Sequence, residues 1–186
     1  TARSYAAFGE VTYALTPTTR LTGGIRYTSE SRDFTGTTRP ILAGGSLGAP
    51  IASSSSSAAN SALKTNQVTY RIALRQDITP DINVYASVNR GFKAGTFNLQ
   101  SPGNLPAKPQ FIMAYEAGFK SELLDRRLRL NLSAYHYDIS DYQVRSAAVN
   151  GGVFGSSVLL NAATVKVDGV ELEFEAAPTD QLRLFG

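Results

Sequence analysis

The sequence of 186 residues has no cysteine and no tryptophan, and it contains one histidine and one methionine. Without cysteine, the chain can form neither a disulfide nor a thiolate metal site. The single histidine, His136, has no histidine or cysteine partner, which argues against a zinc site. Charged residues are also scarce, at 18%, and the net charge of +3 comes from dispersed lysines and arginines. No run of basic residues indicates a nucleic-acid partner.

Long hydrophobic runs are absent as well. The mean hydropathy is −0.13, and no stretch approaches the ~18 consecutive apolar residues of a membrane-spanning helix. No segment of useful length repeats its apolar residues with the period of a helix. These absences exclude a helical membrane protein. They do not exclude a membrane-spanning sheet, because a strand can hide its hydrophobicity in every second residue.

What the sequence does contain is an alternation of apolar and polar residues with a period of two. Between Gln67 and Ile78, the apolar positions are Val68, Tyr70, Ile72, Leu74 and Ile78, and the polar positions include Gln67, Thr69, Arg71, Arg75 and Asp77. Successive side chains of a strand point to opposite faces, so such a strand separates an apolar medium from a wet one.

The connections between segments of this kind alternate between short and long. We predict strands over Ser4–Leu15, Arg20–Phe34, Lys64–Ile78, Ile82–Lys93, Phe111–Leu123, Arg127–Val144 and Val158–Ala177, and an eighth that starts at Leu182. The short turns carry Pro or Asp, which favour chain reversal. The long connections are Thr35–Leu63, Ala94–Gln110 and Arg145–Ser157. This pattern predicts an all-β, antiparallel protein with tight turns on one rim and long loops on the other, as in transmembrane β-barrels.

Two soluble folds compete with this interpretation. A β-sandwich also alternates apolar and polar residues, but the predicted strands run to roughly 12–18 residues, against a usual ~5–6. A lipocalin-like barrel would turn its apolar face inward around a ligand. Such barrels rarely have all their short turns on one rim and all their long loops on the other. The chain opens in a strand pattern and closes on Leu182–Gly186, so we interpret it as an internal fragment of a longer protein.

Three passages carry more specific motifs. Residues 83–98 read NVYASVNRGFKAGTFN, residues 114–131 read AYEAGFKSELLDRRLRLN, and residues 167–174 read VDGVELEF. In this order they resemble barrel strands of the TonB-dependent outer-membrane receptors. The opening strands over Tyr5–Leu15 and Leu21–Tyr27 are similar to earlier strands of the same family, so the resemblance covers essentially everything except the long loops.

This resemblance implies a 22-stranded barrel that is plugged by an N-terminal globular domain. Such receptors lie in the outer membrane of Gram-negative bacteria, bind scarce nutrients, most often ferric siderophores, and release them inward when TonB pulls on the plug. We therefore expect residues 1–186 to be part of a barrel domain, with the plug absent from this sequence. The expected partners are outer-membrane lipid, the plug, TonB and a small-molecule ligand, with no cofactor, no metal site and no nucleic acid.

The candidate functional residues fall into two groups. Charged residues on the polar faces are expected to line the barrel lumen or contact the plug: Arg26, Arg71, Arg75, Glu116, Lys120, Glu171 and Glu173. The ligand-facing candidates are aromatic residues near the long loops: Phe97, Tyr135, Tyr137, Tyr142 and Phe154. The tyrosines near predicted strand ends are also expected to anchor the membrane interface: Tyr13, Tyr27, Tyr135, Tyr137 and Tyr142. No catalytic residue is predicted, since Glu171 and Glu173 lie along one strand face without a neighbouring base.

The main alternative function is that of a structural anchor or adhesin. Eight strands suffice in principle to close a small barrel, and such a barrel would need no plug. An outer-membrane enzyme or a passive porin is a weaker alternative. No nucleophile–base arrangement supports the enzyme, and the three motifs do not belong to porins. Under the fragment interpretation, we predict an open, curved sheet with two unpaired edges.

Overall fold

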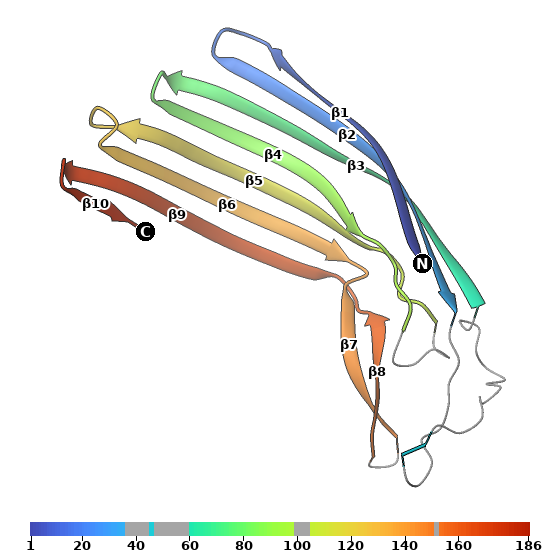
Figure 1. Ribbon diagram of the computed structural model, residues 1–186. Coiled ribbons are helices and arrows are strands. Elements are labelled where there is room, and N and C mark those ends of the chain that lie inside the picture. The colour runs from blue at the N-terminus through green and yellow to red at the C-terminus, as the bar shows by residue number, and fades with distance from the viewer. Residues whose placement is uncertain (36–44, 47–59, 99–104, 151–152) are drawn as a thin grey trace.

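The computed structural model describes residues 1–35, 45–46, 60–98, 105–150 and 153–186. Across these residues the chain forms ten strands and no helix (Figure 1). The strands are β1 (Ala2–Ala14), β2 (Thr19–Thr35), β3 (Asn60–Thr79), β4 (Ile82–Lys93), β5 (Gln110–Leu123), β6 (Leu128–Ser140), β7 (Gln143–Asn150), β8 (Val153–Asn161), β9 (Val165–Thr179) and β10 (Leu182–Phe185). No helix in the described part of the chain could cross a membrane.

Eight of these strands form one antiparallel sheet in the order β1-β2-β3-β4-β5-β6-β9-β10. Each strand pairs with its neighbour in sequence, except that β6 pairs with β9. The sheet is long, curved and a single layer thick (Figure 1). Within the described residues β1 and β10 are its two edges, and no pairing joins them. The predicted open sheet is therefore confirmed, and the closed eight-stranded barrel of the alternative interpretation is not what forms.

The short turns lie at one end of the sheet and the long connections at the other, as the sequence predicts (Figure 1). Thr79 and Ile82 bound the tight turn between β3 and β4, and Thr179 and Leu182 bound the one between β9 and β10. The β5–β6 turn is the most strained, because Leu124, Asp125 and Arg126 have φ of 55°, 54° and 66°. These left-handed values are unfavourable for residues other than glycine.

The predicted strands Arg127–Val144 and Val158–Ala177 and the long loop Arg145–Ser157 are wrong in detail. Residues 158–161 belong to β8, and β9 begins only at Val165, after a break at residues 162–164. The first of the two strands ends at Ser140, because Asp141 adopts a left-handed φ of 53° and the chain bends there. Residues 143–161 then form β7 and β8, which pair with each other as a separate two-stranded sheet. This hairpin projects from the long-loop end of the large sheet (Figure 1).

Buried side chains gather at this long-loop end. The buried apolar residues of the described chain are Ala94, Phe97 and Ala107, at 9%, 8% and 2% exposure. Along the strands, by contrast, large apolar side chains are exposed, including Val170 at 71% and Ile25 at 62%. With no second layer packed on it, the sheet needs an apolar medium on one face.

Candidate functional site

The strand register assigns the alternate residues to two faces of the large sheet. Pairing aligns side chains of one face into rows that run across neighbouring strands. One row consists of Leu74, Ala86, Ala117, Ala134 and Val170, and the next consists of Gln76, Val84, Phe119, Leu132 and Leu172. Except for Gln76, which lies near the short-turn end of β3, these side chains are all apolar, so this apolar face is suited to lipid.

Polar groups return on the apolar face closer to the long loops. The next row is Ile72, Val88, Tyr115, His136 and Asp168, and the row beyond it is Tyr70, Arg90, Met113, Asp138 and Lys166. His136 Nδ1 lies 2.6 Å from Asp168 Oδ1, and its Nε2 lies 3.3 Å from Asp138 Oδ2. Tyrosines beside ionised groups are typical of a membrane–water boundary, which these two rows therefore mark.

The opposite, polar face carries the seven predicted lumen-facing charges: Arg26, Arg71, Arg75, Glu116, Lys120, Glu171 and Glu173. Apart from Lys120, which lies on β5, they divide by sign across the sheet. The arginines lie on β2 and β3, whereas the glutamates lie on β5 and β9. The register supports a shared polar face for all seven. Contact with a plug or a ligand stays a prediction.

A cluster of tyrosines and glutamate lies at the centre of the polar face; we call Tyr85, Glu116, Tyr135 and Tyr137 the tyrosine–glutamate cluster. The Tyr85 hydroxyl donates a 2.6 Å hydrogen bond to Glu116 Oε1. Glu116 pairs directly with Tyr135 across β5 and β6. The rings of Tyr135 and Tyr137 stack with centroids 4.7 Å apart and planes at 19°. The cluster therefore presents aromatic surface, hydroxyl groups and a carboxylate together.

Two glycines make room for this cluster. Gly118 pairs with Tyr85, and Gly169 pairs with Tyr135. A Cβ atom at either glycine would collide with the tyrosine ring opposite. Each ring therefore lies flat across the neighbouring strand, which is possible only where that strand has no side chain.

Two of the three remaining charges of the β5–β9 half, Lys120 and Glu173, have local partners. Lys120 Nζ lies 5.3 Å from the centroid of the Tyr85 ring. Asn131 Nδ2 donates to Glu173 Oε2 at 3.4 Å. No hydrogen bond or ion pair to Glu171 is found among the described residues, and this residue pairs across the sheet with Ser133. Of the three predicted glutamates, Glu171 therefore has the most free capacity to bind a group from outside the sheet.

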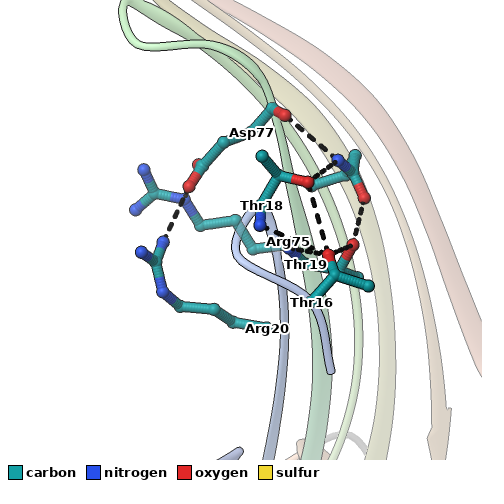
Figure 2. A network of polar contacts seen from close by, with 7 residues as sticks. Thr16, Thr18, Thr19, Arg20, Arg75 and Asp77 are labelled. Carbon is teal, nitrogen blue, oxygen red and sulfur yellow. Dashed lines mark hydrogen bonds and ion pairs between the residues drawn. The ribbon is translucent and has the colours of Figure 1, made fainter. Parts of the chain in front are cut away.

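At the short-turn end, a polar network surrounds Arg75 (Figure 2). Asp77 accepts from Arg75 Nε and from an Arg20 guanidinium nitrogen, each at 2.7 Å. Gln76 Nε2 donates to Thr18 Oγ1 at 3.1 Å, and the Thr19 amide donates to Thr16 Oγ1 at 3.0 Å. The β1–β2 turn is thereby fastened to the end of β3, so this rim of the sheet is held in place. On the same face, the Arg26 guanidinium lies 5.6 Å from the centroid of the Phe8 ring.

The predicted ligand-facing aromatics are placed differently from one another. Tyr135 and Tyr137 are on the polar face, and Tyr142 lies at the bend before β7, 36% exposed. Phe97 is only 8% exposed and stacks on Phe34 at 5.5 Å, so the structure gives it a packing partner, and ligand contact by Phe97 stays a prediction. The side chain of Phe154 in β8 lies outside the described residues.

The tyrosines that were expected to anchor the membrane interface lie on different faces of the sheet. Tyr13 and Tyr27 are on the apolar face, at 66% and 49% exposure, where a membrane anchor belongs. Tyr135 and Tyr137 are on the polar face, so for them an interfacial role in lipid is wrong.

Side-chain amides at the long-loop end were not singled out from the sequence. Asn98 is 4% exposed and Gln143 is 8% exposed, and both bond to backbone atoms of other segments. Asn161 does the same through Lys108 and Asp141. A sequence signal existed for Asn98, since it ends the motif of residues 83–98. Nothing in the local pattern marks Gln143 or Asn161.

Comparison with known proteins gives a family match over the whole chain. The model of the "TonB dependent receptor-like, beta-barrel" family matches residues 1–186. The pesticin receptor of Yersinia enterocolitica is 28% identical over 176 residues, which are 93% of this chain and 23% of that protein. The metal-pseudopaline receptor CntO of Pseudomonas aeruginosa is 30% identical over 120 residues, 63% of this chain and 16% of that protein. The chain thus spans about a quarter or less of these relatives.

Solved structures share the fold. The copper transporter OprC superposes with a TM-score of 0.77 at 19% identity, covering 98% of this chain and 28% of that one. The ferric yersiniabactin uptake receptor FyuA from Yersinia pestis superposes with a TM-score of 0.71 at 22% identity, covering 96% and 25%. In both cases the long open sheet described above is similar to a segment of a larger chain.

Proposed function

This chain belongs to the TonB-dependent receptor β-barrel family, and on that premise we propose that it forms wall strands of a receptor that imports a metal chelated by a small organic molecule, specifically a ferric siderophore. Members of this family are barrels of the Gram-negative outer membrane, where the chain is accordingly placed. They are receptors and transporters rather than enzymes. The proposed mechanism is ligand capture and gated passage, without bond chemistry.

The observation that carries this proposal is the two-faced sheet. Its apolar face presents continuous rows for lipid, while its polar face presents the tyrosine–glutamate cluster to the lumen. Aromatic surface with hydroxyl groups suits an organic chelate, which offers both flat carbon skeletons and oxygen atoms. The relatives point the same way, because their names include a metal-pseudopaline receptor and a ferric yersiniabactin uptake receptor.

We also propose partners for the polar face in the complete receptor. The free carboxylate of Glu171 and that of Glu116 would bind basic groups of a plug domain that fills the lumen. The arginines of β2 and β3 would bind acidic groups of the same plug. Energy from TonB would act on the plug and not on these strands directly.

The test is uptake of ferric yersiniabactin by the full-length receptor, expressed in cells that lack their own receptor for it. Radioactive iron should accumulate in these cells, and accumulation should cease when TonB is deleted. Binding without TonB-dependent accumulation would reject transport, and failure of both would reject this ligand. A ferric catecholate siderophore would then be assayed in the same cells to test the wider siderophore class.

The role of the cluster is tested with Tyr137→Ala. The affinity for a bound ferric siderophore should fall about tenfold, equivalent to ~1.4 kcal/mol. Tyr27→Ala is the matched control, since Tyr27 is on the apolar face and should leave the affinity unchanged. Equal affinities for both variants would remove Tyr137 from the proposed ligand surface.

A further inference from the structure

The β7–β8 hairpin is the part of this fold that we expect to be unstable without contacts to other segments. It is a two-stranded sheet outside the large sheet, and isolated hairpins of this size are marginally stable in water. Its strand β8 pairs with β7 on one side only. The other side of β8 exposes backbone N–H and C=O groups that need partners.

Asn98 supplies those partners. Its Nδ2 donates to Leu159 O at 3.1 Å, and Leu159 N donates to its Oδ1. The side-chain amide thus pairs with both polar groups of Leu159 as a neighbouring strand would. The same Nδ2 donates to Leu105 O at 2.8 Å, so Asn98 joins its own connection to the hairpin. It is 4% exposed, so water does not compete for these bonds.

Gln143 makes a second attachment at the base of the hairpin. Its Nε2 donates to Ala94 O at 3.1 Å and to Lys108 O at 2.9 Å, and its backbone N donates to Gln110 Oε1 at 2.9 Å. These bonds hold the first residue of β7 against the end of β4 and the start of β5. The side chain is 8% exposed, and its buried Oε1 has no donor among the described residues.

Asn161, the last residue of β8, makes a third attachment between the hairpin and the connection. Lys108 N donates to Asn161 Oδ1 at 2.7 Å, while Asn161 Nδ2 donates to Lys108 O at 3.1 Å and to Asp141 O at 2.7 Å. The two described ends of this connection are joined, because Thr96 and Ala107 exchange two backbone hydrogen bonds at 3.1 and 2.9 Å. Three amide side chains therefore fasten two segments that are far apart in the sequence.

We propose that Asn98, Gln143 and Asn161 act as an amide clasp, which unites residues 94–98 and 105–109 of the connection after β4 with the described part of the β7–β8 hairpin into one rigid unit. Within the proposed uptake function, on which this part rests, the three are positioning residues. They hold the long-loop end of the wall in the arrangement that captures ligand, without touching the ligand themselves. Because the connection and the hairpin are joined, a ligand that binds one of them keeps a fixed position relative to the other.

The clasp is tested by hydrogen exchange on the full-length receptor in detergent. Asn98→Asp is nearly isosteric, but it replaces the Nδ2 donor with an oxygen that repels the carbonyl oxygens of Leu105 and Leu159. The attachment of β8 should therefore be lost, and exchange along β8, including the Leu159 amide, should rise at least tenfold. Gln143→Ala should raise exchange across the base of the hairpin. Asn66→Asp is the matched control, because Asn66 is an exposed asparagine in the middle of β3. Unchanged exchange in both clasp variants would overturn the proposal.

A second measurement separates the clasp from the proposed ligand. Ferric yersiniabactin affinity should fall about tenfold in Asn98→Asp, and a cross-linked cysteine pair at positions 98 and 159 should restore it. A merely destabilised barrel would not be rescued by a local cross-link. Faster exchange with unchanged affinity would overturn the positioning role. If the wild-type receptor does not bind this probe, the proposed ligand fails while exchange alone decides the clasp.

Discussion

At the scale of single residues, the arrangement of the polar face depends on two glycines, which have no side chain. Gly118 and Gly169 leave space for the rings of Tyr85 and Tyr135, and both rings then reach toward Glu116 or Tyr137. The side chains that carry the proposed chemistry are therefore oriented by residues that have no side chain. Loss of that space would misplace the rings even though every tyrosine is still present.

We predict that Gly169→Ala displaces Tyr135 from its stack on Tyr137. The expected cost is about 1–3 kcal/mol in the free energy of unfolding, as for other overpacked sites, and ligand affinity should fall as well. Urea unfolding of the full-length receptor in lipid vesicles measures the first effect. Gly23→Ala is the control, because a Cβ there would meet nothing within 4 Å.

A second residue-scale feature is the single carboxylate between two arginines. Arg20 and Arg75 are directly opposite each other on β2 and β3, and like charges in that position repel. Asp77 accepts from both, which converts a repulsive pair into a bridged one (Figure 2). Since the guanidinium groups are about half exposed, the gain is that of a surface ion pair.

We therefore predict that Asp77→Asn lowers the free energy of unfolding by no more than a surface ion pair contributes, and that the loss shrinks at high salt. Adding Arg75→Gln should recover part of this loss, because it removes the repulsion that Asp77 compensates. Thermal unfolding at two salt concentrations would measure both effects. Two results would contradict the electrostatic explanation: a loss of stability that does not depend on salt, or a double variant that is less stable than Asp77→Asn alone.

At the scale of elements, period-two alternation was enough to predict the eight strands of the large sheet and their shared faces. The signal is strong because each strand separates lipid from water and so repeats one pattern over many residues. It failed at Asp141, since a single left-handed residue breaks the strand without disturbing the alternation. Gly151-Gly152 between two apolar-polar runs was the available sign of the β7–β8 hairpin.

The amide clasp could not be predicted by the same means. Its bonds join residues 98 and 159, or 108 and 161, and such pairs are set by how the segments fold back on each other. An isolated Asn or Gln in a loop looks the same whether it is exposed or buried. The cluster around Glu116 was partly predictable, because Tyr135 and Glu116 were both candidates, but their pairing came only with the register.

The two faces of one strand give an element-scale prediction. Ala134→Arg places a charge in a wholly apolar row, at an expected cost of ~2–4 kcal/mol if that row is near the bilayer midplane. Ser133→Arg, one residue away on the polar face, should cost far less. Urea unfolding in lipid vesicles compares the two. Equal costs would mean that the assignment of the faces is wrong.

At the scale of the whole molecule, the sheet has a free edge at β1 and another at β10. β1 is exposed along its entire length, with Tyr5 at 72% and Phe8 at 77%. A long flat edge of this kind pairs with any strand that it meets. The described sheet therefore needs further strands on both sides to be stable.

We predict that these 186 residues, refolded alone in detergent, associate through their edges into mixed oligomers. Sedimentation velocity should show several species, and a lysine at Val11 on the edge strand should reduce their size. The full-length receptor, measured in the same detergent, is the control. A single monomeric species from the isolated chain would show that its edges are protected in a way the sheet does not reveal.

The clasp at the long-loop end has a consequence for how such a surface can change over evolutionary time. Most of its bonds from Asn98, Gln143 and Asn161 end on main-chain atoms, such as the carbonyl oxygens of Leu105, Leu159 and Lys108. Every amino acid supplies that oxygen, so the side chains at these acceptor positions are free to vary. The side chains around the clasp can therefore change from one related sequence to another while the bonds that hold this end of the sheet together are kept.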